Sequence, residues 1–181
     1  GSIFDLKISN GFNGYRHCLH IGEHVKLYYG SERNQFESGK QSLNLVMSGQ
    51  ACREFENFMN GSWFDLFMML LSYDTSNFKR LDIAIDDFDA KELNIYDLMP
   101  YVANDHYVSP MQSDSIRYDK KNGVSKGYSI TLGSANSNQL VIYDKLLERK
   151  AKNERDLDTS IWFRYEMRFH DDKCLKVISQ Y

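Results

Sequence analysis

Several features that define well-known protein classes are scarce in this 181-residue chain. It has only 2 prolines and 3 cysteines, and the cysteines (Cys18, Cys52 and Cys174) lie far apart in the sequence. An odd number of scattered cysteines fits neither a disulfide framework nor the paired spacing of a zinc site. A reducing cytoplasm is the simplest interpretation of this pattern.

Long hydrophobic segments are also absent. The longest uninterrupted apolar run is the stretch from Leu66 to Leu71, whereas a membrane-spanning helix needs about 20 apolar residues. The first residues show no pattern of a secretory signal peptide. The sequence therefore predicts a protein without membrane association.

An excess of positive charge is missing as well. Lys and Arg number 22 against 25 Asp and Glu, which gives a formal net charge of -3. Net charge therefore does not attract this chain to nucleic acid, and any contact with DNA must come from local patches. The chain also lacks a glycine-rich phosphate loop, a nucleophile elbow and a metalloprotease helix motif. These absences exclude the phosphate-loop NTPases.

The length of the chain fits one domain with a sizeable core. Gly1-Ser2 looks like a cloning remnant, and we predict a single catalytic domain over residues 3–181, excised from a longer protein. Aromatic residues are abundant at 14%, and 12 of them are tyrosines. Tyrosine supplies core volume as well as candidate nucleophiles, so no single tyrosine stands out by its presence alone.

The hydrophobic pattern predicts more strands than helices. Strands are expected at 15–21, 25–29, 42–47, 80–86, around 108, 115–118, 128–132, 139–143 and 161–169. Helices are expected at 52–71 with a break at Asn60-Gly61, around 95–102, at 145–155 and from 171 onward. Strand and helix do not alternate regularly, so we predict an α+β fold with an antiparallel sheet covered on one face by helices.

Two segments about eighty residues apart, 80–87 and 163–169, each alternate charged and apolar residues with the period of a β-strand. Successive side chains of a strand point to opposite faces of the sheet. Each segment therefore has one apolar face, which requires a core, and one polar face. The polar faces carry Asp82 and Asp86 on the first segment and Arg164, Glu166 and Arg168 on the second.

If these strands neighbour each other in one sheet, the three carboxylates and the arginines meet on one surface. Carboxylate oxygens suit a hard cation, and guanidinium groups suit a phosphate. We therefore predict that Asp82, Asp86 and Glu166 bind a divalent metal, Mg²⁺ or Mn²⁺. The alternative is that both aspartates are solvated on an edge strand, with Glu166 paired to Arg164 or Lys145. Asp87 points to the other face of a regular strand and is a lesser choice.

Five motifs occur in an order that resembles the replication initiation factor family, which comprises the rolling-circle initiators of Gram-positive plasmids and related relaxases of integrative and conjugative elements. The motifs are Ser48 to Glu56, Arg80 to Asp87, Leu132-Gly133-Ser134 with Ser137, Ile142 to Lys145 with Glu148, and Arg164-Tyr165-Glu166. The resemblance runs from about Tyr15 to the last residue. Each motif alone is weak, and their order makes the resemblance fairly specific.

The resemblance implies a metal-dependent enzyme that nicks origin DNA and transfers the strand. In this family a tyrosine attacks one phosphodiester, holds the 5′ end as a phosphotyrosine and frees a 3′ hydroxyl. The fold implied is a variant of the nicking-endonuclease sheet without the usual histidine pair. The implied partners are a double-stranded origin or an origin of transfer, with a hairpin, and a host superfamily 1 helicase in a bacterial cytoplasm.

The nucleophile is where this sequence departs from the family. The family's tyrosine sits two residues before the Gly-Ser pair, and here Thr131 occupies that position. A threonine hydroxyl is a poorer nucleophile and leaving group than a phenol of pKa about 10. The candidates are Tyr128, which needs a β-bulge near Ser129 to reach the polar face, and Tyr143, with Tyr128 ranked slightly ahead. A half-buried structural tyrosine is an equally good interpretation of either one.

Other polar residues are candidates for catalysis and for DNA contact. Lys145 and Arg164 are expected to act in catalysis, although Asp144 and Lys145 are equally well explained as an ion pair at a helix start. DNA contacts are expected from a hairpin with an Asn122-Gly123 turn and from the second strand, through Arg117, Lys120, Lys121, Lys126 and Arg168. A second basic cluster contains Lys145, Arg149, Lys150, Lys152 and Arg155. Solvated surface explains each cluster about as well.

Three functions fit these observations. The first is a nicking and strand-transfer domain, which leaves protein attached to a 5′ end. The second is an origin-binding module of the same fold that has lost its nucleophile, as Thr131 suggests. The third is a nuclease that uses the same carboxylates and an activated water, and it nicks DNA without a covalent intermediate.

Overall fold

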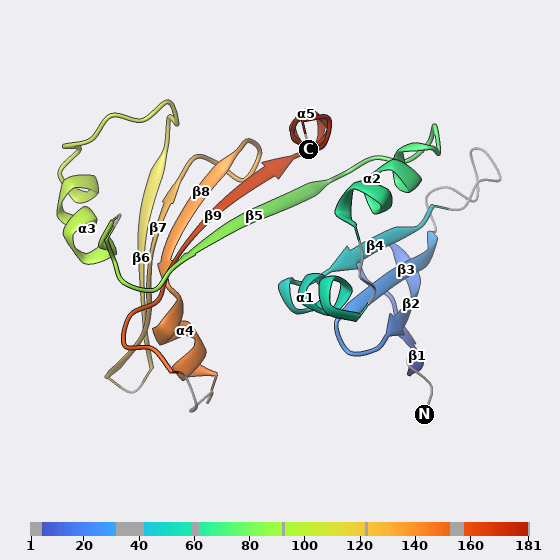
Figure 1. Ribbon diagram of the computed structural model, residues 1–181, viewed down its shortest axis with the longest axis horizontal. Coiled ribbons are helices and arrows are strands. Elements are labelled where there is room, and N and C mark those ends of the chain that lie inside the picture. Colours follow the sequence, from blue (N-terminus) through green and yellow to red (C-terminus); the bar gives the residue numbers. More distant parts are fainter. Residues whose placement is uncertain are drawn as a thin grey trace. The chain divides into compact units, whose positions relative to one another are not determined.

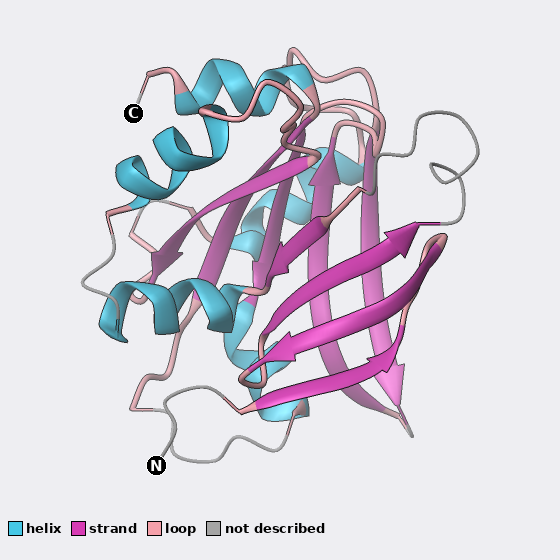
Figure 2. Ribbon diagram, turned by 90° about the vertical axis from the view of Figure 1, so that its right-hand side faces the viewer, coloured by secondary structure: helices cyan, strands magenta, loops and turns pink. Residues whose placement is uncertain are grey.

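The computed structural model describes residues 5–31, 42–58, 62–91, 93–121, 123–152 and 158–180. The chain divides into two compact units, Gly1–Ser72 and Tyr73–Tyr181, and each is described by itself. The prediction for residues 3–181 was one domain with one antiparallel sheet, but each unit has a sheet of its own. Figures 1 and 2 show the strands and helices of both units. No helix of the described residues is long and apolar enough to span a bilayer.

The first unit is a four-stranded antiparallel meander followed by two helices. Its elements are β1 (Leu6–Asn10), β2 (Tyr15–Ile21), β3 (Val25–Ser31), β4 (Asn44–Met47), α1 (Gly49–Phe58) and α2 (Trp63–Leu71). The predicted strands are confirmed, and β1 is an additional strand whose five residues alternate too briefly to give a signal. The predicted break at Asn60-Gly61 lies outside the described residues.

A serine side chain caps the N-terminus of each helix of the first unit. The Ser48 and Ser62 hydroxyls accept hydrogen bonds from the backbone N–H groups of Ala51 and Asp65, each at 3.2 Å. Such N-caps satisfy N–H groups that have no partner within the helix. Trp63 then joins the two helices, because its ring lies 4.8 Å from that of Phe55 and its indole N–H donates to Glu56.

The second unit contains a five-stranded sheet in the order β5-β9-β8-β7-β6, with every neighbouring pair antiparallel. Its elements are β5 (Arg80–Asp87), α3 (Ile95–Ala103), β6 (Asp114–Lys121), β7 (Val124–Leu132), β8 (Gln139–Asp144), α4 (Lys145–Ala151), β9 (Phe163–His170) and α5 (Asp172–Ile178). The first and the last of these strands, β5 and β9, pair along their whole length. This pairing joins the two alternating segments (Figure 1).

The core of the second unit lies between α3 and one face of the sheet. Its buried residues are Ile95 and Val102 from α3 and Ile130, Ile142 and Phe163 from β7, β8 and β9. Full burial of such a side chain contributes about 1.5–3 kcal/mol. We call the face that carries Ile130, Ile142 and Phe163 the apolar face. The fold class, an antiparallel sheet with a helix packed on one face, is confirmed.

A helix cap and a tight turn fix where two elements of the second unit begin and end. Asn94 begins α3 by accepting a hydrogen bond from the Tyr96 backbone N–H at 2.9 Å. Gly133 ends β7 with φ of 90°, and a Cβ there would lie 2.1 Å from the Asn138 carbonyl oxygen. Only glycine fits such a close turn with positive φ. The strand predicted around Val108 is wrong, since Val108 is fully exposed in a loop and pairs with no strand.

Candidate active site on the five-stranded sheet

The face opposite α3 carries the charged residues of both alternating strands. Arg164 of β9 pairs with Asp86 of β5 on one side and with Tyr143 of β8 on the other. The pairing continues from Tyr143 to Ser129 of β7 and from there to Arg117 of β6. One row of residues therefore crosses all five strands on what we call the polar face. The next rows of this face contain Thr131, Val141, Glu166 and Ala84, then Gln139, Arg168 and Asp82.

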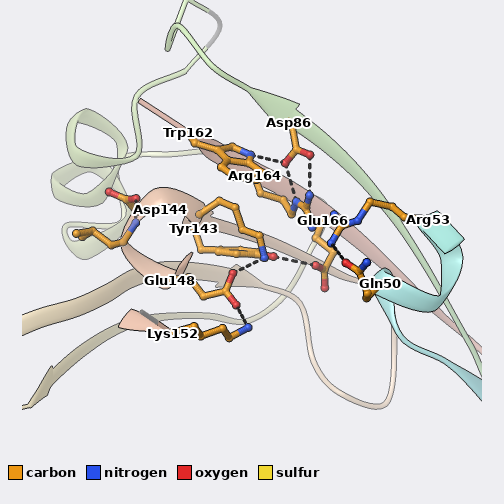
Figure 3. Close-up of polar contacts among 12 residues, drawn as sticks. Gln50, Arg53, Asp86, Tyr143, Asp144, Glu148, Lys152, Trp162, Arg164 and Glu166 are labelled. Carbon is orange, nitrogen blue, oxygen red and sulfur yellow. Dashed lines mark hydrogen bonds and ion pairs between the residues drawn. The ribbon is translucent and has the colours of Figure 1, made fainter. Parts of the chain in front are cut away.

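Asp86 is the most closely held carboxylate of the polar face. The Arg164 guanidinium donates to both of its oxygens, at 2.7 and 2.6 Å, and the Trp162 indole N–H donates to Oδ1 at 2.8 Å. Burial raises the pKa of Asp86, but the hydrogen bonds from Arg164 and Trp162 outweigh it, so that the pKa lies below its ordinary value. Asp86 therefore stays ionised and fixes both partners, as Figure 3 shows.

Glu166 lies one row further along the same face, between two arginines and a tyrosine. Arg168 donates to Oε1 at 2.7 Å, and the Arg80 guanidinium lies 3.9 Å from the same oxygen. Arg80 also binds Asp82 through two hydrogen bonds of 2.7 and 2.5 Å. The other oxygen of Glu166, Oε2, accepts a hydrogen bond from the Tyr143 hydroxyl at 3.3 Å.

Tyr143 is the tyrosine that these groups surround (Figure 3). Burial first and the Glu166 charge second raise the pKa of Tyr143 to about 12, while Arg164 acts in the opposite direction. The Lys145 ammonium lies 5.6 Å from the centre of its ring. A phenol of such a pKa needs a base to become a nucleophile, and the Glu166 carboxylate is in position to accept its proton.

Lys145 itself is buried, with 7% of its surface exposed, and forms an ion pair with Glu148. Burial lowers the pKa of Lys145, and Glu148 opposes this change. Glu148 also binds Lys152. Glu148 thus holds the Lys145 side chain next to the Tyr143 ring.

Two carboxylates next to the site have structural roles. Asp144 caps α4 by accepting a hydrogen bond from the Leu147 backbone N–H at 2.8 Å, and its other oxygen accepts one from the Tyr96 hydroxyl. Asp87 is buried on the apolar face and accepts from the Ala90 backbone N–H at 2.8 Å. The prediction that Asp87 points away from the other two aspartates is confirmed.

The three predicted metal ligands share one face, as the alternation requires, but they do not form one ligand set. Asp82, Asp86 and Glu166 each bind an arginine instead. Within the described ranges, no group of three His, Cys, Asp or Glu residues is placed to hold a metal ion. A cation at these carboxylates would have to compete with the guanidinium groups, so the arrangement does not fit a site in which all three bind one ion.

Tyr128 lies on the apolar face, not on the polar face. It pairs with Tyr118, and its ring packs against Tyr96 at 5.3 Å and against Tyr118 at 4.6 Å. The only shift in the β6–β7 register falls between Asp119 and Lys120. That irregularity precedes Tyr128 along β7 and leaves Tyr128 next to the core. The expectation that a bulge near Ser129 turns Tyr128 toward the carboxylates is therefore wrong.

Thr131, which takes the family's tyrosine position in the predicted motif, does lie on the polar face. It pairs with Val141 of β8, whose other neighbour is Glu166. Thr131 is thus two strands from Glu166, whereas Tyr143 contacts it. Among the candidate nucleophiles, Tyr143 alone combines the polar face with a hydrogen-bonded carboxylate.

The predicted DNA-binding residues are distributed over both faces and the hairpin. Arg117 lies on the polar face and pairs with Asp119 at 3.0 Å, whereas Lys120 lies over the Tyr118 ring at 4.5 Å. Lys126 lies at the register shift, between Ser125 and Gly127, which pair with Lys120 and Asp119. Arg168 binds Glu166. The side chain of Lys121 and all of Asn122 and Arg155 lie outside the described residues.

Sequence reasoning missed Arg80 and Trp162 as members of the site. Arg80 begins the first alternating segment and Trp162 directly precedes the second, two residues from Asp82 and Arg164, respectively. The same period of two that singles out the aspartates would have included them. Glu148 was named only as part of a family motif, which gives no indication of its bond to Lys145.

The sequence of this chain is similar to those of known proteins. The profile of the family described as "Replication initiation factor" matches residues 76–181, more than half of the chain. The chain belongs to the replication initiation factor family. The matched region begins just before β5 and contains every residue of the polar face.

Two similar proteins extend the match over both units. "Putative DNA relaxase NicK" of Bacillus subtilis (strain 168) is 28% identical over 178 residues, 94% of this chain and 48% of that protein. A rolling-circle replication initiator protein from Geobacillus stearothermophilus has a solved structure that matches with a TM-score of 0.75 and 25% identity, over 98% of this chain and 63% of that one. This member of the replication initiation factor family thus spans about half the length of the first protein and less than two thirds of the second.

Proposed function

We propose that this chain is a site-specific DNA nicking and strand-transfer domain of the rolling-circle initiator or relaxase type. Membership of the replication initiation factor family supports this proposal, as do the names of the two similar proteins. The single observation that carries it is the Tyr143 hydroxyl, 3.3 Å from the Glu166 carboxylate among paired arginines. The proposed partner is origin DNA with a hairpin, and a host helicase remains a prediction.

The proposed reaction is a transesterification at one phosphodiester. The Tyr143 oxygen attacks phosphorus and gives its proton to Glu166, and the bond from phosphorus to the 3′ oxygen breaks. The 3′ oxygen takes a proton from water and becomes a free hydroxyl, while the 5′ phosphate remains on the tyrosine. The free hydroxyl can prime synthesis, and reversal of the reaction rejoins the strand.

Positive groups near Tyr143 suit the charge that develops on the non-bridging phosphate oxygens. Arg164 is the neighbour of Tyr143 on β9 and the Lys145 ammonium lies 5.6 Å from the centre of the Tyr143 ring, and both are already ordered by carboxylates. Preorganised donors of this kind contribute several kcal/mol where water is excluded. A phosphate would share Arg164 with Asp86, which keeps the guanidinium plane fixed during the reaction.

The test uses a labelled pool of single-stranded oligonucleotides of random sequence. We expect an adduct that survives SDS, and sequencing of the captured DNA would identify the preferred site. Tyr143→Phe should abolish the adduct. Tyr128→Phe and Thr131→Ala serve as matched controls and should retain it. An adduct that persists in Tyr143→Phe and disappears in Tyr128→Phe would overturn the assignment.

The rival functions give different outcomes in the same experiment. An origin-binding module, favoured by Thr131 in the family's tyrosine position, would enrich a DNA sequence without cutting it. A nuclease with an activated water would cut without an SDS-resistant adduct. Either result would reject the proposed transesterification.

The divalent cation remains a prediction with its own test. Nicking is measured after removal of metal with EDTA and again after addition of Mg²⁺ or Mn²⁺. Activity that depends on the added ion supports the prediction. Full activity in EDTA rejects it and leaves the arginines and Lys145 to offset the phosphate charge.

A further inference from the structure

The polar face continues beyond the last paired residues of β5 and β9 with two aromatic side chains. Asp87 and Phe163 form the final pair of the ladder, so Phe88 follows it on one strand and Trp162 precedes it on the other. Their ring centroids are 5.2 Å apart, with an interplanar angle of 35°. Phe88 keeps 54% of its surface exposed. We call these two residues the aromatic pair.

Trp162 is held rigidly by charged neighbours. Its indole N–H donates to Asp86 at 2.8 Å, and the guanidinium carbons of Arg164 and Arg149 lie 6.0 and 5.9 Å from the ring centre. Figure 3 shows Trp162 beside Asp86 and Arg164. The ring is therefore preorganised, which reduces the entropy lost when a planar ligand binds.

A shallow hollow of about 500 Å³ opens next to Phe88. Its apolar lining comes from Ile85, Phe88, Leu93 and Tyr165, and carboxylates of Asp86, Asp87 and Asp89 also border it. An apolar floor with an acidic border suits a neutral aromatic ring and repels a phosphate. The positive groups near the aromatic pair, the guanidinium groups of Arg149 and Arg164, lie at the Trp162 ring.

This distribution of charge matches one nucleotide whose base and phosphate point in different directions. Two residues along a strand span about 6.6 Å, so the aromatic pair is one such step from the Asp86–Arg164 pair. Bases of single strands stack on aromatic side chains irrespective of sequence. A duplex keeps its bases stacked inside and cannot supply one.

We propose that Phe88 and Trp162 form a stacking site for one unpaired base of single-stranded DNA, with the neighbouring phosphate at Arg164. The proposal deepens the proposed function, since it orients the strand on the polar face next to Tyr143. The two residues position the DNA and take no part in the chemistry. A purely structural aromatic pair that closes the end of the sheet is the alternative to be rejected.

The test uses the fluorescence of Trp162. The chain has 2 tryptophans, so Trp63→Phe leaves Trp162 as the only one and keeps an aromatic ring at position 63. Titration with single-stranded thymidine oligonucleotides of about 12 residues should quench this fluorescence. A duplex of the same length and an abasic oligonucleotide should not.

Substitutions at Phe88 separate stacking from packing. Phe88→Ala should weaken binding of the oligonucleotide about 5- to 100-fold, as expected for one lost stacking contact. Phe88→Tyr should retain affinity, and Phe88→Leu, which keeps apolar volume without a ring, should be as weak as Phe88→Ala. Equal binding by Phe88→Leu and the parent, or equal quenching by abasic DNA, would overturn the proposal.

The fluorescence test is independent of the nicking test. Tyr143→Phe in the Trp63→Phe background should still show quenching, because the base site does not include the phenol. Quenching without any covalent adduct would sink the proposed chemistry and leave the stacking site standing. An adduct at Tyr143 without quenching would do the reverse.

Discussion

The two faces of the five-stranded sheet are made by the same strands and differ in what they require. On β8, Ile142 is buried against α3 while its neighbour Tyr143 contacts Glu166. The apolar face needs side chains of about the right size, and several substitutions satisfy that need. The polar face needs a particular partner for each charged group, because an unpaired group away from water is costly.

The difference is clearest in how each face responds to a lost partner. A smaller side chain on the apolar face leaves a cavity, and its cost is one of stability. On the polar face, the loss of one member changes the charge or the position of its neighbours. The site therefore depends on a network, whereas the core depends on summed contacts.

The largest effect is expected on the polar face, from removal of Glu166, the proposed acceptor of the tyrosine proton. Glu166→Gln should slow adduct formation about 10²- to 10⁴-fold. The remaining rate should rise with pH, since the phenol, whose pKa burial helps to raise to about 12, must then ionise without a base. Quenched-flow measurement of adduct formation from pH 7 to 10 checks this prediction.

Asp82→Asn is the matched control for Glu166→Gln. Asp82 shares the polar face but binds Arg80 and not Tyr143, so its loss should reduce the rate less than tenfold. Equal damage by both variants would contradict the role of Glu166 as the base and favour a shared ligand role for the two carboxylates.

On the apolar face the expected effect is one of stability alone. Ile142→Ala should lower the free energy of unfolding by about 2–5 kcal/mol, whereas Tyr143→Phe should lower it by less than about 1.5 kcal/mol. Urea unfolding in the Trp63→Phe background, followed through the fluorescence of Trp162, measures both. If the two adjacent residues cost the same, the contrast between the faces fails.

An intermediate effect is expected for Asp86, which links the network to pH. Its folded pKa lies below the unfolded value of about 3.9, because the bonds from Arg164 and Trp162 outweigh burial. Its contribution is fully present above the unfolded pKa and is lost as pH falls through the lower folded pKa. Asp86→Asn should thus cost about 1–3 kcal/mol at pH 7, and the difference from the parent should shrink below pH 4.

Urea unfolding of both proteins between pH 2 and pH 7 measures this difference. Asp89→Asn is a suitable control, because Asp89 is exposed and is not part of the network on the polar face. A gap between Asp86→Asn and the parent that stays constant down to pH 2 would contradict the paired, ionised state of Asp86.

The smallest effect is expected at the outer strand β6. Arg117 lies on the polar face and Lys120 over Tyr118, so Arg117→Ala should weaken binding of single-stranded DNA less than tenfold, and Lys120→Ala should not change it. The slope of log affinity against log salt should fall by about 0.7 in the first variant only. A larger change in Lys120→Ala would place the DNA on the other side of the hairpin.

Much of this contrast was predictable from the sequence, because a strand's period of two follows from backbone geometry. Asp82, Asp86 and Glu166 could thus be placed on one face, and Asp87 on the other. The pattern says nothing about which partner each carboxylate takes. That choice depends on side-chain reach across strands, and here arginines took the positions predicted for a cation.

The choice between tyrosines failed for a related reason. Tyr128 and Tyr143 both lie in strands, and their faces depend on strand register and on the position of one bulge. Register follows from long-range pairing, which one sequence does not reveal. The division into two units was not predicted either. It falls between Ser72 and Tyr73, in the short segment between α2 and β5, which was not interpreted as a linker.

The order in which the strands occur along the chain has a consequence for synthesis. β9 lies between β5 and β8 in the sheet, although it follows both of them in the sequence. Until it is made, β5 has no neighbour and Tyr143 has no acceptor for its proton. Under the proposed mechanism, a nascent chain that lacks β9 has an incomplete site, and the site is completed only when β9 inserts between β5 and β8.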